Sequence, residues 1–320
     1  MNGRFVSLLI PCYNAERWVA QTIESALTQA WPGKEIIVVD DGSIDGSLDV
    51  IRRYEDRIRW ETGPNRGGNH TRNRLLELAR GEWLQYLDAD DYLLPDKIER
   101  QVEFLAAHPA TDIVFGPMTM EYAEKKDSPR KLLPIPAPHD PWILLARWFL
   151  PQTGALLWRK QAVLDVGSWK PDQQCCQEHE LYLRLLMAGK RFAYCEHNGA
   201  IYRQWGDHTV SKREKPEMHR QRLEIEQRLE NFLRERNELT PARLYAINQA
   251  RLETARSAWQ YDRSFATAIM RTVRESQPNF IPFGDAAPLR YRLVYRLLGF
   301  RGAEKLADMR RNFTGHRVRV

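Results

Sequence analysis

The sequence predicts an α/β protein with a mostly parallel central sheet, followed by a helical region. Three observations support this prediction. In the first half of the 320-residue chain, short apolar runs typical of buried strands alternate with segments of helical periodicity. Several of these runs end in acidic or polar residues, as strands do at the ligand-binding edge of a parallel sheet. From about Pro216 onward, long helical patterns replace the alternation.

Strands and helices alternate along the first third of the chain. Apolar runs predict strands over 5–10, 35–39, 58–61, 83–87 and 112–115. Helical spacing predicts helices over 15–28, 47–54 and 69–79, and Pro95 opens a fourth. Asn14 is expected to cap the first helix, because its side chain can accept a hydrogen bond from a first-turn N–H. The apolar runs are nearly continuous, so we expect helices on both faces of the sheet.

The later elements carry weaker signals. Residues 121–141 are polar and rich in proline and are expected to form a loop, whereas 152–158 predicts a strand and 178–187 a short helix. Thr240 and Pro241 form a cap and first-turn pair that opens a further helix. We therefore expect an α/β domain over 1–211 and a helical, basic region over 212–320.

The composition, 43% hydrophobic and 28% charged, is that of an ordinary globular protein and excludes collagen-like, disordered and disulfide-scaffold classes. No apolar stretch approaches about 18 uncharged residues, so no membrane-spanning helix is predicted. The N-terminal apolar run is better explained as a strand than as a signal peptide. The four cysteines form no CxxC pair and fit reduced thiols of a cytoplasmic protein.

A zinc site is an alternative for one group of residues. Cys175, Cys176, His179, Cys195 and His197 lie close together in the sequence. Their spacing matches no standard zinc pattern, so buried or incidental side chains are the favoured interpretation.

The net charge of +6 is concentrated near the C-terminus. Residues 290–320 contain nine Lys or Arg against two acids, a balance of +7 that leaves −1 for the rest. Such a region can bind nucleic acid, an anionic membrane or an anionic substrate, or it can be a solvated helix face. Six apolar residues are interspersed: Tyr291, Leu293, Tyr295, Leu297, Leu298 and Phe300. We expect this region to contact the cytoplasmic face of a membrane, with packing inside the protein as the alternative.

Two acidic clusters follow predicted strands. The sequence contains neither GxGxxG nor GxxxxGK[ST], so a nicotinamide dehydrogenase and a P-loop hydrolase are poorly supported. Asp88-Ala89-Asp90 puts two carboxylates at a strand end, where both can reach one hard cation such as Mg²⁺ or Mn²⁺. Asp40-Asp41-Gly42-Ser43 puts a carboxylate where it can accept a hydrogen bond from a nucleobase. Exposed turns are the alternative for both.

Basic residues lie between these two clusters. Arg66, Arg72 and Arg74 are suited to neutralising a diphosphate. Ordinary surface charge on a helix is the alternative for each of them.

Together, these segments resemble the inverting family 2 glycosyltransferases, which bind nucleotide sugars with the Rossmann-like GT-A fold. The resemblance covers about residues 4–211 and rests on six segments in order. They are SLLIPCYNAERWVAQTIESALTQ, EIIVVDDGSIDGS, GPNRGGNHTRNRLLELARGEWLQYLDADDYLLPDKI, TGALLWRKQAVLDVGSW, QEHELYLRLLMAGKRFAYC and YRQWGDHTVS.

The resemblance implies roles for individual residues. The implied nucleotide-binding set is Pro11, Tyr13, Asn14, Asp40, Asp41, Arg66, Arg72 and Asp88, with Asp41 reading the base and Asp88 on the ribose. Asp90, with Asp88, is implied to hold Mg²⁺ or Mn²⁺. The family often has a histidine two residues after the arginine of the last segment. In this chain Trp205 occupies that position, so His208 or Asp207 is the candidate third metal ligand. The alternative for His208 is a loop histidine with no metal role.

Glu178 matches the general base of the family. The usual motif is Glu-Asp, whereas this chain has Gln177-Glu178, so the base is one methylene longer and the preceding acid is missing. Gln177 is therefore assigned no role. Glu180 is the nearest rival base, and a helix-surface acid beside Arg184 is its alternative interpretation.

The implied activity is an inverting, metal-assisted sugar transfer in polysaccharide biosynthesis. The donor is a nucleotide sugar, with a UDP-sugar as the first choice, and the acceptor is a glycan or a lipid-linked glycan. We expect no nucleic-acid partner and a cytoplasmic or peripheral membrane location. Two other functions stay open: a nucleotidyltransferase, which typically needs a glycine- and lysine-rich phosphate loop, and a non-catalytic nucleotide-binding or scaffold protein.

Overall fold

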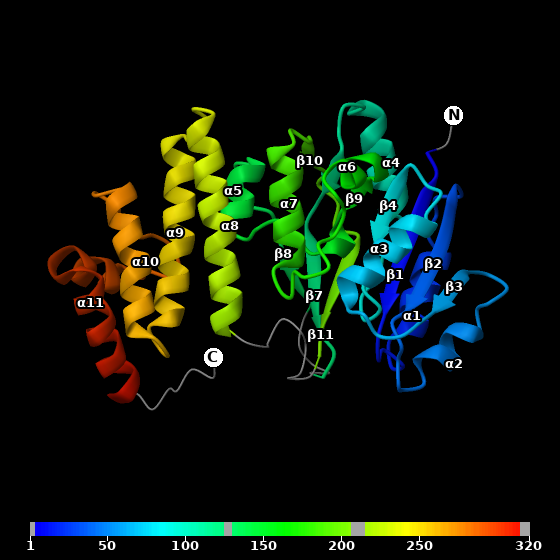
Figure 1. Cartoon of the computed structure of the whole chain (residues 1–320), viewed down its shortest axis with the longest axis horizontal. Helices are drawn as coiled ribbons and strands as arrows, with labels where there is room; N and C mark the ends of the chain where they lie inside the picture. The colour runs from blue at the N-terminus through cyan, green and yellow to red at the C-terminus, as the bar shows by residue number, and fades with distance from the viewer. Residues whose placement is uncertain (1–3, 125–129, 206–214, 314–320) are drawn as a thin grey trace. The chain divides into compact units, whose positions relative to one another are not determined.

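The computed structural model describes residues 4–124, 130–205 and 215–313, and the chain divides into two compact units (Figure 1). The first unit comprises Met1–Leu145 with Phe149–Arg213, and the second comprises Ala146–Trp148 with Glu214–Val320. The boundary that we expected at 211 lies outside the described residues and stays a prediction. A catalytic role for this unit stays a prediction.

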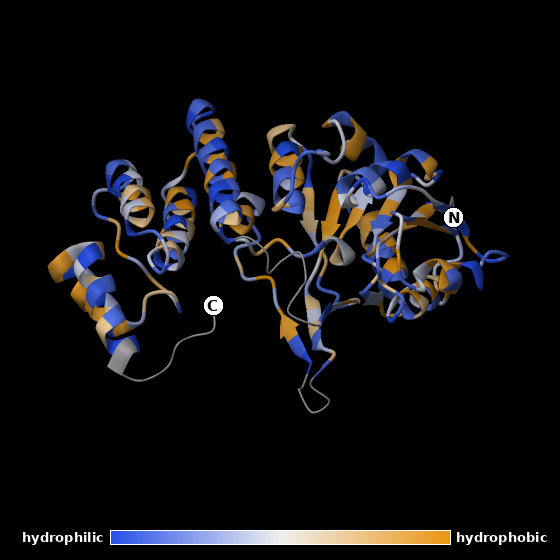
Figure 2. Ribbon diagram, turned by 60° about the horizontal axis from the view of Figure 1, so that its bottom comes forward, coloured by the Kyte–Doolittle hydropathy of each residue, from blue (hydrophilic) through white to orange (hydrophobic). Residues whose placement is uncertain are grey.

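A seven-stranded sheet forms the centre of the first unit. Its strands are β1 (Val6–Cys12), β2 (Lys34–Asp40), β3 (Arg59–Thr62), β4 (Trp83–Tyr86), β6 (Ile113–Phe115), β9 (Leu157–Arg159) and β10 (Phe192–Tyr194), in the order β10-β6-β9-β4-β1-β2-β3. Only the pairs that β9 makes with β4 and β6 are antiparallel. The prediction of a mostly parallel α/β sheet is confirmed, and the strands are among the most hydrophobic parts of the chain (Figure 2).

Helices cover this sheet, which explains why its central strands lack polar alternation. They are α1 (Val19–Leu27), α2 (Ser47–Arg52), α3 (Gly68–Leu78), α4 (Lys97–Ala107), α6 (Lys160–Asp165) and α7 (Gln177–Met187). A further short helix, α5 (Pro141–Ala146), ends at the first residue of the second unit's 146–148 segment. Helix α7 packs through Tyr182, whose ring stacks on Trp158 of β9 at a centroid distance of 5.5 Å. All four residues of β4 are buried.

A second, four-stranded sheet corrects one expectation. Its strands are β5 (Tyr92–Leu93), β7 (Met118–Tyr122), β8 (Lys131–Leu133) and β11 (Ala200–Gln204), in the order β5-β11-β7-β8. The prediction of a loop over 121–141 was wrong for residues 131–133, which form β8 and pair antiparallel with β7. Three residues between prolines are too short for a pattern, and only the pairing with β7 makes them a strand. The strand expected over 152–158 begins instead as a 3₁₀ turn, η1 (Thr153–Ala155).

Asn14 does not cap α1, which begins only at Val19. Its backbone is left-handed, with φ 49°, a conformation that asparagine tolerates well. Its side-chain oxygen accepts from the N–H of Ile44 at 2.9 Å, and its own N–H donates to Ser43 Oγ at 2.9 Å. Asn14 therefore ties the segment after β1 to the segment after β2, a role that depends on contacts remote in sequence.

The second unit is helical, as expected. Its helices are α8 (Lys215–Glu235), α9 (Pro241–Ala258), α10 (Arg263–Ser276) and α11 (Leu289–Phe313), and α11 is kinked at Gly299, which has φ 66°. Thr240 caps α9 by accepting a hydrogen bond from the N–H of Arg243 at 3.3 Å. No helix in the described part of the chain has both the length and the apolar character needed to cross a bilayer.

Candidate functional site

The acidic clusters meet at one edge of the large sheet because β4, β1 and β2 are parallel neighbours. The backbone N–H of Asp41 donates to Cys12 O at 2.8 Å, and that of Leu87 donates to Leu9 O at 2.9 Å. The segments that follow the three strands therefore begin side by side. This is the edge at which open parallel sheets bind ligands.

Asp41 holds the loop that leads into α3. Its two carboxylate oxygens accept the backbone N–H groups of Arg66 at 2.8 Å and Gly67 at 2.9 Å. Gly42 is required beside it, because its φ is +72° and an added side-chain carbon would lie 2.8 Å from the backbone nitrogen of Asn65. The neighbouring Asp40 is buried and accepts from Thr62 Oγ1 at 2.7 Å. Both aspartates thus stabilise the local backbone, which the sequence did not predict.

A cavity of about 520 Å³ lies beside these residues. Its lining includes Asp40 and Asp41 from the end of β2, with Arg66, His70 and Thr71 around the start of α3. Cavities of this size suit part of a small ligand such as a nucleoside. Among the described residues that line this cavity, the predicted nucleotide-binding residues Pro11 of β1 and Tyr13 and Asn14 after it are not included.

Arg72 joins two parts of the site. Its side chain is only 9% exposed, and Nη2 donates to Asp88 Oδ1 at 2.9 Å. Its Nη1 donates to Gln177 Oε1, in the first turn of α7, at 2.8 Å. The guanidinium also lies over the ring of Trp169, 4.9 Å from its centroid. Gln177, to which we assigned no role, thus links α7 through Arg72 to Asp88-Ala89-Asp90, which we call the DxD segment.

Two asparagines of α3 hold the chain that precedes α7. Asn69 Nδ2 donates to Lys170 O at 2.6 Å, and Asn73 exchanges hydrogen bonds with the backbone of Trp169. Asn69 and Asn73 are four residues apart and share one face of the helix, and Arg72 Nη1 donates to Asn69 Oδ1 at 3.4 Å. Sequence reasoning missed them, although polar residues at this spacing on a largely buried helix are a usable signal.

Glu178 is half-buried in the first turn of α7. Burial raises its pKa above the ordinary value for a glutamate. The positive charge of Arg72 opposes this rise, and the negative charge of Asp88 adds to it. A carboxylate with a raised pKa is the kind of group that can accept a proton from a hydroxyl in a reaction.

Glu180, the rival base, has a different environment. Its carboxylate is buried and accepts from Lys170 Nζ at 2.6 Å and from Arg184 Nε at 2.7 Å. Burial opposes its ionisation, but these two hydrogen bonds outweigh burial and hold its pKa below the usual range. Glu180 therefore serves the packing of α7, and Glu178 is the better candidate base.

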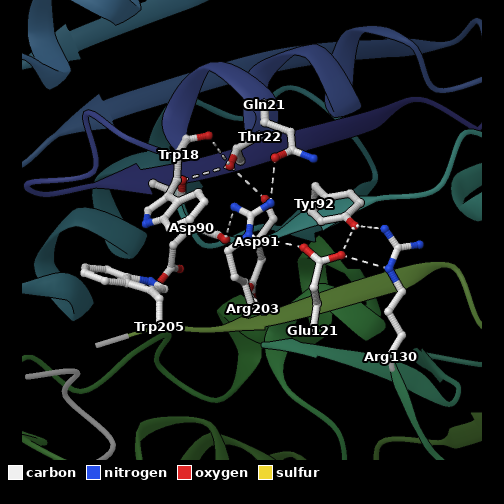
Figure 3. Close-up of polar contacts among 11 residues, drawn as sticks. Trp18, Gln21, Thr22, Asp90, Asp91, Tyr92, Glu121, Arg130, Arg203 and Trp205 are labelled. Carbon is white, nitrogen blue, oxygen red and sulfur yellow. Dashed lines mark hydrogen bonds and ion pairs between the residues drawn. The ribbon is translucent and has the colours of Figure 1, made fainter. Parts of the chain in front are cut away.

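Trp205, which occupies the position where family 2 glycosyltransferases often have a histidine, contacts Asp90. Trp205 Nε1 donates to Asp90 Oδ2 at 2.8 Å (Figure 3). Burial and the charge of Asp88 raise the pKa of Asp90, and this hydrogen bond opposes the rise. His208 and Asp207, the expected third ligands, lie outside the described residues.

Asp88 and Asp90 supply hard oxygen donors, which fit Mg²⁺ or Mn²⁺. Across the described ranges, however, no group of three or more His, Cys, Asp or Glu side chains is arranged to hold a metal ion. In proteins, Mg²⁺ bound by one or two carboxylates commonly takes further oxygens from substrate phosphates and water. The same finding leaves the zinc alternative without support in this part of the chain.

Arg203 organises the DxD segment from the second sheet (Figure 3). Its guanidinium donates to Asp90 O and to Gln21 Oε1 of α1, each at 2.7 Å, and lies over Trp18 at 4.3 Å from the ring centroid. Its backbone N–H donates to Asp91 Oδ1 at 2.7 Å. The sequence analysis assigned Arg203 no role and used it only to locate the position that Trp205 occupies.

Acidic and aromatic neighbours fix Arg203 in turn. Glu121 Oε1 lies 3.6 Å from its Nε, and Glu121 also accepts from Tyr92 Oη and Arg130 Nε, each at 2.8 Å. The network draws on β7, β11 and α1, whose residues are far apart in sequence.

The sheet, its acidic edge and the flanking helices define an α/β domain of the GT-A type. S. aureus TarS, in a crystal structure with UDP-GlcNAc, has a similar fold, with a TM-score of 0.62 over 98% of this chain and 93% of that chain, at 16% identity. Residues 7–164 match the family described as Glycosyl transferase family 2, and this part of the chain belongs to that family.

Curated relatives match over a limited length. An uncharacterized glycosyltransferase of Haemophilus influenzae is 38% identical over 109 residues, which are 33% of this chain and 44% of that protein. The Escherichia coli UDP-Glc:alpha-D-GlcNAc-diphosphoundecaprenol beta-1,3-glucosyltransferase WfaP is 35% identical over 122 residues, 38% of this chain and 47% of that protein. The matched segment thus spans less than half of each relative.

We expect Asp41→Asn to destabilise the loop before α3, because the new amide N–H₂ faces a backbone N–H instead of accepting from it. Losing one such bond costs about 1–3 kcal/mol. Urea unfolding of the full chain should show this loss, and the exposed Asp56→Asn is the matched control. Equal stability of the two variants would contradict the role of Asp41.

Proposed function

We propose that the chain transfers a sugar from a nucleoside-diphosphate donor to a hydroxyl group, with inversion at the sugar carbon. The observation that carries this proposal is the contact of Arg72 with both Asp88 and Gln177. It couples the proposed donor segment to the helix turn that contains the proposed base, Glu178.

The donor proposal rests on the cavity beside Asp41. Each oxygen of this carboxylate accepts one backbone N–H and keeps a second lone pair, which suits the imide N–H of uracil. Cytosine lacks that donor. The name of the E. coli relative includes UDP-Glc, which also favours a UDP-sugar. Arg66 and Arg72 are the proposed cations for the diphosphate.

Asp90 and Asp88 are the residues proposed to hold Mg²⁺ or Mn²⁺. When bound, the cation would neutralise charge on the leaving diphosphate. Arg203 and Trp205 orient Asp90 for this task, because one fixes its backbone and the other its carboxylate. One oxygen of Asp88 accepts a hydrogen bond from Arg72. We propose that Asp88 also binds the ribose of the nucleotide.

Glu178 is proposed to accept the proton of the acceptor hydroxyl. A hydroxyl has a high pKa and needs a base within hydrogen-bond reach as it attacks. Attack from the side opposite to the leaving diphosphate inverts the sugar carbon, so one carboxylate suffices and no covalent sugar–enzyme intermediate is needed. This differs from hydrolysis between two opposed carboxylates. The acceptor is proposed to be a glycan or lipid-linked glycan, the class that the E. coli relative's name describes.

Glu178→Gln keeps the shape of the side chain and removes the proton acceptor, so turnover should fall by about 10²–10⁴-fold. Nucleotide affinity should stay the same, because the base faces the acceptor. The assay measures nucleoside diphosphate released from a panel of nucleotide sugars with a polyprenyl-diphosphate-linked sugar. The exposed Asp172→Asn, in the chain before α7, should keep full activity.

Two results would contradict this function. Equal turnover of Glu178→Gln and the unaltered chain would remove Glu178 as the base. Release of pyrophosphate in place of nucleoside diphosphate would point to the nucleotidyltransferase alternative.

The pH dependence gives a second test of Glu178. The base acts only when it is ionised, and burial raises its pKa from the ordinary 4.5. As the pH falls through this raised pKa, Glu178 takes up a proton and kcat/KM should decrease. This acidic limb should lie above pH 4.5 and should be absent from the residual activity of Glu178→Gln. An unchanged limb in that variant would assign it to another group.

Asp90→Asn should abolish the metal-dependent part of nucleotide binding, because a neutral amide is a much weaker ligand for a hard cation. Titration calorimetry of UDP with and without Mn²⁺ measures that part directly, with Asp56→Asn as the control. Full activity of the unaltered chain in excess chelator would contradict metal assistance.

A further inference from the structure

The last helix of the second unit exposes a row of leucines. Leu289, Leu293 and Leu297 are 64%, 53% and 82% exposed, and they follow one another at intervals of four residues before the kink at Gly299. Residues at this interval share one face of a helix. Figure 2 shows hydrophobic and hydrophilic residues interspersed along α11. We refer to these three side chains as the leucine row.

The other face of the same turns packs inside the unit. Tyr291 and Tyr295 are each 8% exposed, and Phe300, beyond the kink, packs edge-on against Trp259 at a centroid distance of 5.5 Å. Internal packing thus accounts for three of the six apolar residues noted in the basic region. It does not account for the leucine row.

Arginines stand on both sides of the leucine row. At 100° per residue, Arg290 and Arg296 lie on opposite flanks of the face that carries the leucines. Within the residues that the structure describes, no carboxylate is within ion-pair distance of either. Both acids of α11 are engaged elsewhere: Glu304 with Arg256 at 2.6 Å and Asp308 with Arg311 at 2.5 Å.

We propose that this face of α11 docks on an anionic lipid surface, with the helix lying in the plane of the interface. Leucines flanked by arginines suit such a surface, since the apolar groups enter the boundary and the guanidinium groups meet anionic headgroups. The segment from Leu289 to Leu298 is about 15 Å long, which is too short to span a bilayer and long enough to lie on one.

A second copy of the chain is the less favoured occupant. In a symmetric contact the leucine rows of two copies would face each other, and each would bring Arg290 and Arg296 toward the same residues of its partner. Like charges brought together in this way oppose association. A lipid surface has the complementary charge.

Flotation of the full chain with vesicles tests the proposal. The chain should float with vesicles that contain phosphatidylglycerol, more weakly with phosphatidylcholine alone, and less as salt is raised. The pair Leu293→Ser and Leu297→Ser should weaken binding by on the order of tenfold or more. The pair Arg290→Gln and Arg296→Gln should weaken it about fivefold for each arginine removed.

Matched controls separate this surface from general effects. Leu164→Ser removes an equally apolar exposed side chain from α6, and Arg271→Gln removes an exposed charge from α10. Both should float like the unaltered chain. Glu178→Gln should also float normally, because docking is independent of the proposed sugar transfer. Circular dichroism checks that each variant keeps its helices.

Three outcomes would overturn the proposal. The first is no flotation with phosphatidylglycerol vesicles at low salt. The second is equal flotation of the paired leucine variant and the unaltered chain. The third is a concentration-dependent dimer in sedimentation that the leucine pair abolishes while vesicles have no effect, which would assign the leucine row to a second copy.

Discussion

The ion pair between Arg72 and Asp88 is the interaction on which the geometry of the candidate site depends. Its two members come from α3 and from the segment after β4, and the guanidinium is almost completely buried. A buried charge without a partner is strongly destabilising, so the guanidinium of Arg72 depends on Asp88, whose side chain is 28% exposed, as its charge partner. The same guanidinium contacts Gln177, which relates the position of the DxD segment to the first turn of α7.

The neutral amide of Gln177 has an electrostatic consequence for Glu178. It accepts the hydrogen bond of Arg72 as a carboxylate would, but it leaves Asp88 as the acidic partner of that guanidinium. A glutamate at 177 would add a second negative charge beside Glu178, and like charges raise the pKa of a carboxyl. Gln177 therefore keeps the contact with Arg72 while limiting how far the pKa of Glu178 is raised.

Most strands of the large sheet were predictable because a strand that is buried on both faces consists of consecutive apolar residues. The order of the acidic clusters was predictable for the same reason, since each follows such a run. By contrast, Asn14 contacts Ile44 across 30 positions, and Arg203 contacts Gln21 across 182. Contacts of this kind leave no local pattern. The sequence therefore singled out Asp88 and Asp90 as candidate ligands but did not predict the contacts that hold them in place, such as those of Arg72 and Trp205.

The basic region shows a different limit of sequence reasoning. Helical spacing establishes that Leu293 and Tyr295 lie on different faces, but it does not say which face is buried. Both residues are apolar, and both have arginines near them in sequence. Only packing against α9 and α10 decides the matter, because Tyr291 and Tyr295 belong to the core cluster of the second unit and the leucines do not. The leucine row lies outside this core with arginines beside it, and the proposed anionic lipid surface would account for both features together.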